Sequence, residues 1–184
     1  MSRPVFLAMT LMYAAGACLS FGLLAMSTCH PDEPKKGSKT AYDHMLRALY
    51  RHTVPTVDAA TLRRELQGPA GPVLLDARAP AEFAVSHLPG AQLVPLDSLA
   101  TAQFAGLDRE RPVVVYCSVG YRSERVGDRL QALGFKHVRN LYGGLFQWVN
   151  EGYPVVNAAG PTTDVHPYSV LWSMWVKRGR KVYK

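Results

Sequence analysis

Cysteine is scarce in this 184-residue chain, which contains three. Two of them, Cys18 and Cys29, lie in or just after an apolar N-terminal stretch, so Cys117 is alone in the body of the chain. A single thiol excludes a disulfide framework, and no cluster of cysteine and histidine at metal-ligand spacing surrounds it. We therefore expect no metal ion, and Cys117 is either an inert buried residue or a reactive nucleophile.

Charged residues are absent from the run 4–26, which follows Arg3. About 20 apolar residues can span a bilayer, whereas the apolar part of a signal peptide is usually about 7–15 residues long. Residues 1–29 are interpreted as a signal peptide or as a membrane or lipoprotein anchor, with Cys29 lipidated in the last case. Each alternative predicts an extracytoplasmic, periplasmic domain if Arg3 stays inside, and an anchor adds a membrane contact through the N-terminus.

Acidic residues are outnumbered, which gives a formal net charge of +7, but much of the basic excess lies at the C-terminal end. We expect no nucleic-acid partner, because the basic cluster forms a tail and not a groove across the domain. The aromatic and basic segment 158–184 also carries Trp172 and Trp175. This segment either lies in a membrane interface or packs on the domain or on the helix at 42–50. Packing is favoured, because Trp and Leu at helical spacing are usually core residues.

Between these ends, short apolar runs alternate with helical patterns. Residues 30–52 are expected to form a linker with a short amphipathic helix at 42–50, and the domain proper to occupy 53–157. Five short strands that alternate with helices predict an α/β fold around a mostly parallel sheet. The strands are expected at 54–57, 73–76, 91–94, 113–116 and 137–141, and the helices at 59–66, 80–84, 123–133 and 144–150.

Two strand ends carry chemically active side chains, and in parallel sheets such groups gather at the carboxyl edge. Asp76 ends one strand, and Cys117 lies between another strand and a helix. Backbone N–H groups and the helix dipole at such a position lower a thiol pKa from about 8.5 to about 3.5–7.5. Gly120 allows the loop to bend so that N–H groups converge, and Arg122 and Arg125 add charge suited to an oxyanion. On this local pattern alone, an inert buried cysteine beside a solvated helix face remains open.

Five segments of the chain form a series of motifs, namely Val73-Leu74-Leu75-Asp76-Ala77-Arg78, Glu82-Phe83, Ser86-His87-Leu88-Pro89-Gly90-Ala91, Val115-Tyr116-Cys117-Ser118-Val119-Gly120-Tyr121-Arg122-Ser123 and Leu141-Tyr142-Gly143-Gly144-Leu145-Phe146-Gln147-Trp148. In order and at the right separations, these segments resemble the successive motifs of rhodanese-like domains. Their joint occurrence is far more specific than any one of them. The resemblance covers roughly residues 53–156.

The resemblance implies a rhodanese-like three-layer fold, with a mostly parallel five-stranded sheet flanked by helices. It makes Cys117 the catalytic residue, which would hold sulfur as a persulfide. Asp76 and Arg78 match family positions beside the site. We interpret Arg78 as a structural ion-pairing residue and His87 as a group that fixes the Pro89-Gly90 turn. The residues expected to bind substrate are Ser118, Val119, Gly120, Tyr121, Arg122, Arg125 and Asp76.

The function implied by the resemblance is sulfur transfer. Cys117 would take a sulfane sulfur from a small anionic donor such as thiosulfate and pass it to cyanide or a thiol, with no metal or organic cofactor. One alternative is a sulfur-carrier or protein-binding module with little turnover of small molecules. Another is a phosphatase or arsenate reductase. It is disfavoured because Cys117 and Arg122 are spaced Cys-x4-Arg, one residue short of the phosphatase loop, and a shorter loop makes a smaller anion nest.

Overall fold

The computed structural model describes residues 40–98 and 104–183. The predicted signal or anchor at 1–29, including Cys29, lies outside the described residues. Within the described part of the chain, no helix is long and apolar enough to cross a membrane.

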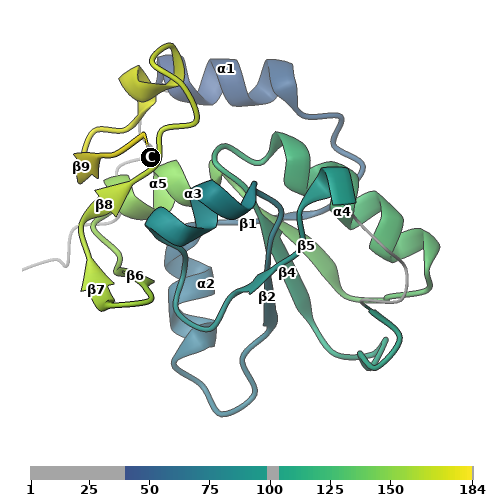
Figure 1. The fold of residues 1–184 in the computed structure, drawn as a ribbon. Helices are drawn as coiled ribbons and strands as arrows, with labels where there is room; N and C mark the ends of the chain where they lie inside the picture. Colours follow the sequence, from purple (N-terminus) through teal and green to yellow (C-terminus); the bar gives the residue numbers. More distant parts are fainter. Residues whose placement is uncertain (1–39, 99–103, 184) are drawn as a thin grey trace, which may run out of the picture. The chain divides into compact units, whose positions relative to one another are not determined.

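A five-stranded sheet forms the centre of the folded unit, in the order β1-β5-β4-β2-β3, and every pair of neighbouring strands is parallel (Figure 1). In the longest pairing, Val73 to Asp76 of β2 lie opposite Val113 to Tyr116 of β4. The parallel sheet predicted from the alternating pattern is thus confirmed. The strands are β1 (Thr56–Val57), β2 (Val73–Asp76), β3 (Gln92–Leu93), β4 (Val113–Tyr116) and β5 (Val138–Leu141).

Helices cover both faces of the sheet. Successive side chains of each central strand point to opposite sides, so each strand contributes to an apolar cluster on either face. Along β4, Val114 and Tyr116 enter one apolar cluster, whereas Val113, Val115 and Cys117 enter the other. The first cluster takes side chains from α1, α2 and α5, and the second from α4. This is the three-layer arrangement that was predicted. The helices are α1 (Ala41–Leu49), α2 (Ala59–Leu66), α3 (Pro80–Val85), α4 (Tyr121–Ala132) and α5 (Gly144–Asn150), with short 3-10 turns η1 (Leu96–Ser98) and η3 (Trp172–Trp175).

The predicted elements lie within two residues of their expected bounds, and two of the shifts have a local cause. Strand β1 begins at Thr56 and not at residue 54, because Pro55 has no N–H group to extend the ladder. Helix α4 begins at Tyr121, two residues earlier than predicted, because Gly120 at φ 100° turns the chain directly into the first helical turn. The second shift matters for the site, since it brings the helix N-terminus closer to Cys117.

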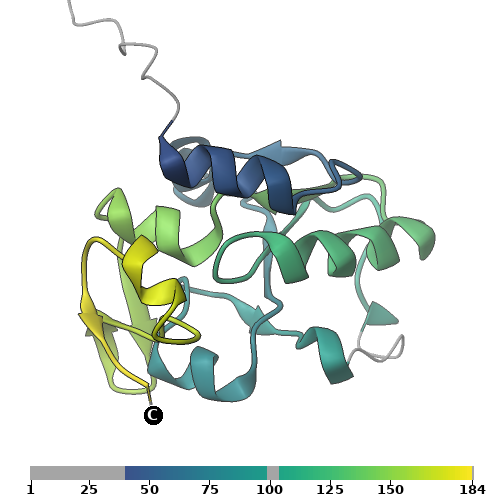
Figure 2. The ribbon, with the colours of Figure 1, turned by 90° about the horizontal axis from the view of Figure 1, so that it is seen from above.

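The segment after α5 packs against the domain, as favoured from its aromatic residues. Val165 and Val176 are buried in the first apolar cluster. The ring of Trp175 lies 5.3 Å from that of Tyr42 in α1, so η3 and α1 are neighbours (Figure 2). The segment also forms a β-hairpin and a short parallel pair, with strands β6 (Val155–Asn157), β7 (Gly160–Thr162), β8 (Asp164–Val165) and β9 (Arg180–Lys181).

Candidate active site

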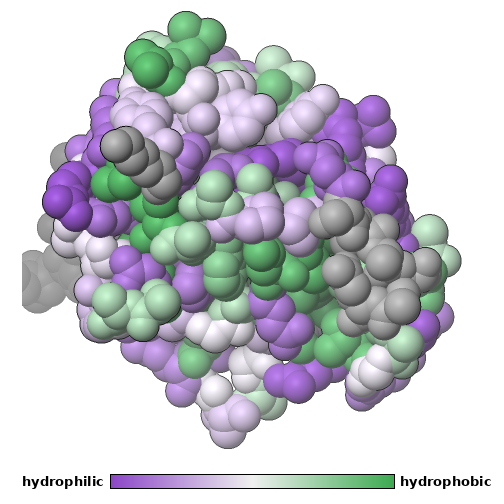
Figure 3. Space-filling model, viewed as in Figure 1, coloured by the Kyte–Doolittle hydropathy of each residue, from purple (hydrophilic) through white to green (hydrophobic). Residues whose placement is uncertain are grey.

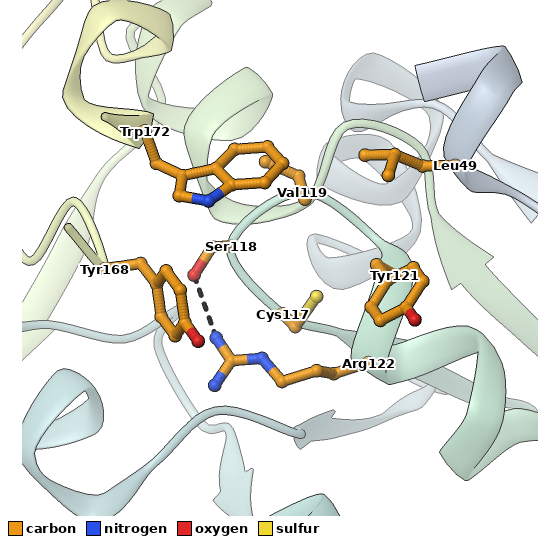
Figure 4. Close-up of a pocket in the computed structure, with 8 residues that line it drawn as sticks. All are labelled: Leu49, Cys117, Ser118, Val119, Tyr121, Arg122, Tyr168 and Trp172. Atoms are coloured by element: carbon orange, nitrogen blue, oxygen red, sulfur yellow. Dashed lines mark hydrogen bonds between the residues drawn. The ribbon is translucent and has the colours of Figure 1, made fainter. Parts of the chain in front are cut away.

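Cys117 lies at the base of a pocket of about 340 Å³, between the end of β4 and the start of α4 (Figure 4). Its side chain is almost completely buried among the residues of the loop that follows it. The carboxyl end of a central parallel strand is where a buried side chain meets a pocket in this kind of fold. The pocket is lined by Leu49, Cys117, Ser118, Val119, Tyr121, Arg122, Tyr168 and Trp172.

The loop from Cys117 to Gly120 turns its carbonyl groups away from the pocket. The carbonyl oxygen of Cys117 accepts a hydrogen bond from the N–H of Leu145 at 2.8 Å, and that of Ser118 from the N–H of Phe146 at 3.0 Å. The next two carbonyls are also bonded, that of Val119 by the Tyr50 hydroxyl (2.7 Å) and that of Gly120 by the Asn140 side-chain amide (2.9 Å). With its carbonyls held outward, the loop directs N–H groups inward, which is the arrangement of an anion nest.

Gly120 is required at the turn of this loop for two reasons. Its φ of 100° is a conformation that other residues rarely adopt. A Cβ atom at Gly120 would also collide with the hydroxyl of Tyr50. In this conformation the Gly120 N–H points at Cys117 Sγ, 3.1 Å away.

The Cys117 thiol is more acidic than its burial alone would make it. Burial raises its pKa, but the charge of Arg122 and hydrogen bonds from the backbone of Ser123 and Val119 outweigh burial, so the pKa lies below its ordinary value. A thiolate is therefore stabilised at the base of the pocket, and the thiolate is the nucleophilic form. Arg122 and these N–H groups distinguish Cys117 from a buried cysteine with only apolar neighbours, which would be inert.

Arg122 is paired with a buried carboxylate that sequence reasoning had left out of the site. Its Nη1 and Nη2 atoms donate to Glu82 Oε2 at 2.7 Å and Oε1 at 2.8 Å. The Ser118 hydroxyl donates to the same carboxylate at 2.9 Å. Although burial opposes it, the pairing with Arg122 lowers the pKa of Glu82. Glu82 thus fixes the guanidinium in place and offsets its charge.

Two residues predicted to bind substrate do not reach the pocket. Asp76 is completely buried and forms an ion pair with Arg78, whose Nη2 lies 2.7 Å from Asp76 Oδ2. Arg125 donates to the Tyr121 carbonyl, and its guanidinium carbon lies 3.6 Å from the centroid of the Tyr121 ring. The Asp76 carboxylate is engaged in its ion pair with Arg78. Arg125 lies one helical turn beyond the loop and stacks on Tyr121. The five other predicted residues do form the loop around Cys117.

Of the two structural interpretations made beside the site, the one for Arg78 agrees with the contacts. Arg78 forms the expected ion pair. The turn-fixing role predicted for His87 is not what the structure shows: its ring lies outside the pocket and contacts α3, not the Pro89-Gly90 turn. Its Nδ1 atom lies 3.0 Å from the carbonyl oxygen of Phe83, and its ring stacks on the Phe83 ring with centroids 3.8 Å apart.

Leu49, Tyr168 and Trp172 line the pocket although sequence reasoning did not assign them to it. Leu49 comes from α1, and the two aromatic residues come from the C-terminal segment. These residues are far from Cys117 in sequence, so no local motif links them to it. The signal in the sequence that could have found Tyr168 and Trp172 was the group of aromatic residues in the C-terminal segment, which had no assigned role in the site.

Comparison with known proteins identifies the family. The rhodanese-like domain model matches residues 58–151, which is about half of the chain. A sulfurtransferase from Allochromatium vinosum is 33% identical over 107 residues, which are 58% of this chain and 99% of that protein. The solution structure of a rhodanese-like domain from Anabaena sp. is 30% identical, with a TM-score of 0.52 over 56% of this chain and 79% of that one. The crystal structure of a thiosulfate sulfurtransferase from Pseudomonas aeruginosa is 31% identical, with a TM-score of 0.50 over 56% of this chain but only 19% of that one.

The chain therefore belongs to the rhodanese-like domain family. Its relatives mark it as a protein of the sulfurtransferase kind. The family match begins after α1 and ends before the C-terminal segment, so Leu49, Tyr168 and Trp172 lie outside the matched residues.

Proposed function

We propose that this protein transfers a sulfane sulfur from thiosulfate to a thiophilic acceptor through a persulfide on Cys117. The Cys117 thiolate attacks the outer sulfur of thiosulfate and forms a new S–S bond, while the S–S bond of thiosulfate breaks and sulfite leaves with the electron pair. An acceptor, cyanide or a thiolate, then attacks the outer sulfur of the persulfide. The Cys117 thiolate leaves with the electron pair of that bond, which restores the starting state.

The loop conformation around Cys117 is the observation that carries this proposal. Its four carbonyls are bonded outward, and the Gly120 N–H points at Cys117 Sγ. Such a nest stabilises the negative charge of the thiolate, and it would do the same for the terminal sulfur of a persulfide. The Cys-x4-Arg spacing keeps the nest small, which favours one sulfur atom over a phosphate group.

An assay with two substrates tests the proposal against its enzymatic alternative. The full chain, incubated with thiosulfate and cyanide, is expected to produce thiocyanate catalytically, and the same preparation is expected to leave p-nitrophenyl phosphate unhydrolysed. Hydrolysis of the phosphate without thiocyanate production would favour the phosphatase alternative. A folded protein with neither activity would favour a binding module.

The lowered thiol pKa predicts how sulfur uptake depends on pH. The rate is expected to rise with pH as Cys117 ionises and then to reach a plateau, with its midpoint at a lower pH than for free N-acetylcysteine, because Arg122 stabilises the thiolate. Arg122→Gln removes that charge and should move the midpoint to higher pH. Alkylation by iodoacetamide, followed over a pH series, measures both midpoints. Equal midpoints for wild-type protein and N-acetylcysteine would contradict the assigned thiol environment.

A further inference from the structure

The walls above Cys117 are mainly apolar and aromatic. Leu49 lies on one side of the thiol and Trp172 and Tyr168 on another, with Tyr121 at the start of α4 (Figure 4). Three of these four residues come from outside the part of the chain that matches the family. The part of the chain that matches the family thus carries the reactive thiol, and the segments before and after it form much of the wall around that thiol.

The upper walls of this pocket carry little charge. Among the described residues that line it, Arg122 alone carries a formal charge, and both of its terminal nitrogens are bonded to Glu82. Arg125, expected to add a second charge, does not line the pocket and stacks on the Tyr121 ring. The upper walls therefore suit an apolar group on the acceptor, whereas negative charge is stabilised at the base, beside Arg122 and the loop N–H groups.

The backbone segments that carry the two aromatic residues are tied down by local contacts. Tyr168 adopts φ 65°, its N–H bonds to His166 Nδ1 at 3.1 Å, and its ring lies 5.1 Å from the guanidinium carbon of Arg122. Trp172 opens η3, and the last residue of η3, Trp175, is anchored through its carbonyl by the Asn150 side chain at 2.8 Å. These contacts position the two rings beside the site, where they give its walls a defined shape.

We propose that Leu49, Tyr168 and Trp172 form an acceptor subsite for a small thiol carried on an apolar group. The proposal rests on the proposed function, because it concerns the second step, the discharge of the Cys117 persulfide. The acceptor thiolate attacks the outer sulfur, its own S–S bond forms as the Cys117–sulfur bond breaks, and Cys117 leaves as the thiolate. The apolar part of the acceptor packs on the indole of Trp172 while its sulfur points to the base of the pocket. The volume of about 340 Å³ is that of a small-molecule pocket and not of a protein interface.

Two uncharged thiols, 2-phenylethanethiol and 2-mercaptoethanol, test the subsite. The full chain is loaded with sulfur from thiosulfate, excess donor is removed, and loss of the added sulfur is followed by intact mass after each thiol is added. Each rate constant is divided by that for the same thiol with a free cysteine persulfide, which removes differences in intrinsic reactivity. We expect the phenyl thiol to be favoured about ten-fold or more, the range seen when apolar groups fill an enzyme pocket.

Variants of the pocket residues show which side chains cause the preference for the phenyl thiol. Trp172→Ala should reduce the ratio to about two-fold or less, since it removes the largest apolar wall. Tyr168→Asn provides a second variant that disturbs the fold little, because Tyr168 is 55% exposed and Asn tolerates a positive φ. It should reduce the ratio in the same direction.

Leu171→Ala is the matched control. Leu171 is an exposed apolar neighbour of Trp172, at 80% exposure, and does not line the pocket. Apolar side chains of this kind gather at the surface over the C-terminal segment, at the top of the space-filling view (Figure 3). This variant should keep the wild-type ratio, which shows that the preference comes from the pocket and not from general surface hydrophobicity.

The outcomes separate the subsite from the proposed function. A wild-type ratio near one, or a ratio that Trp172→Ala and Tyr168→Asn leave unchanged, would overturn the subsite even if Cys117 takes up sulfur normally. Equal loss in Leu171→Ala would also overturn it. Absence of any sulfur on Cys117 in the wild-type protein would overturn the proposed function, and the subsite with it.

Discussion

Replacing Cys117 with serine is expected to lower thiocyanate formation by at least about a thousand-fold, the scale seen when an enzyme loses its nucleophile. Serine has nearly the same size, so the buried position at the end of β4 stays filled. Its hydroxyl ionises only far above neutral pH, and it does not form a stable bond to a transferable sulfur atom. Nothing else in the described loop can accept the sulfur, because the other side chains around the pocket carry no thiol.

The control for this variant is its fold. The far-ultraviolet circular dichroism spectrum and the urea midpoint of Cys117→Ser should match those of the wild-type protein. A folded variant that kept activity within about ten-fold of wild type would show that Cys117 is not the nucleophile.

Asp76→Ala should strongly lower the free energy of unfolding, because it leaves the buried guanidinium of Arg78 without its carboxylate. Nε and Nη2 of Arg78 both donate to this carboxylate, and both side chains are completely buried. Breaking a buried ion pair by removing one partner costs about 3–5 kcal/mol. Urea unfolding, followed by tryptophan fluorescence, measures the change in the free energy of unfolding.

The double variant Asp76→Leu and Arg78→Met provides the matched comparison. Removing both charges should be less destabilising than Asp76→Ala alone, since no unpaired charge remains in the core. A loss below about 1 kcal/mol for Asp76→Ala would contradict the structural role assigned to the pair and would reopen a role for Asp76 beside the substrate.

The sequence was sufficient to predict the sheet and the loop because both are local in the chain. Val113 to Tyr116 form a continuous apolar run, typical of a parallel strand buried on both faces. The loop that follows is contiguous with Cys117, so its residues had to surround the thiol wherever the strand ended. Local pattern could not show the direction of each polar side chain. Arg125 therefore counted as a site residue, although the structure stacks it on Tyr121.

Other parts of the site depend on tertiary contacts that no motif reports. Glu82 lies 40 residues from Arg122, yet it holds the guanidinium through two hydrogen bonds. Tyr50 lies before the residues that match the family, and its hydroxyl donates to the Val119 carbonyl in the loop after Cys117. Trp172 reaches the pocket only because the C-terminal segment packs back on α1. In the sequence, Glu82 was visible only as part of the Glu82-Phe83 motif, and Tyr50 and Trp172 only as aromatic residues without a role in the site. The partners of these residues were not visible there.

Intact mass spectrometry of the full chain after incubation with thiosulfate tests the central claim most directly. The persulfide mechanism predicts a gain of about 32 Da, one sulfur atom, which is absent from Cys117→Ser and is lost when cyanide is added. A folded wild-type protein that gains no mass, or a gain that persists in Cys117→Ser, would contradict sulfur transfer through Cys117.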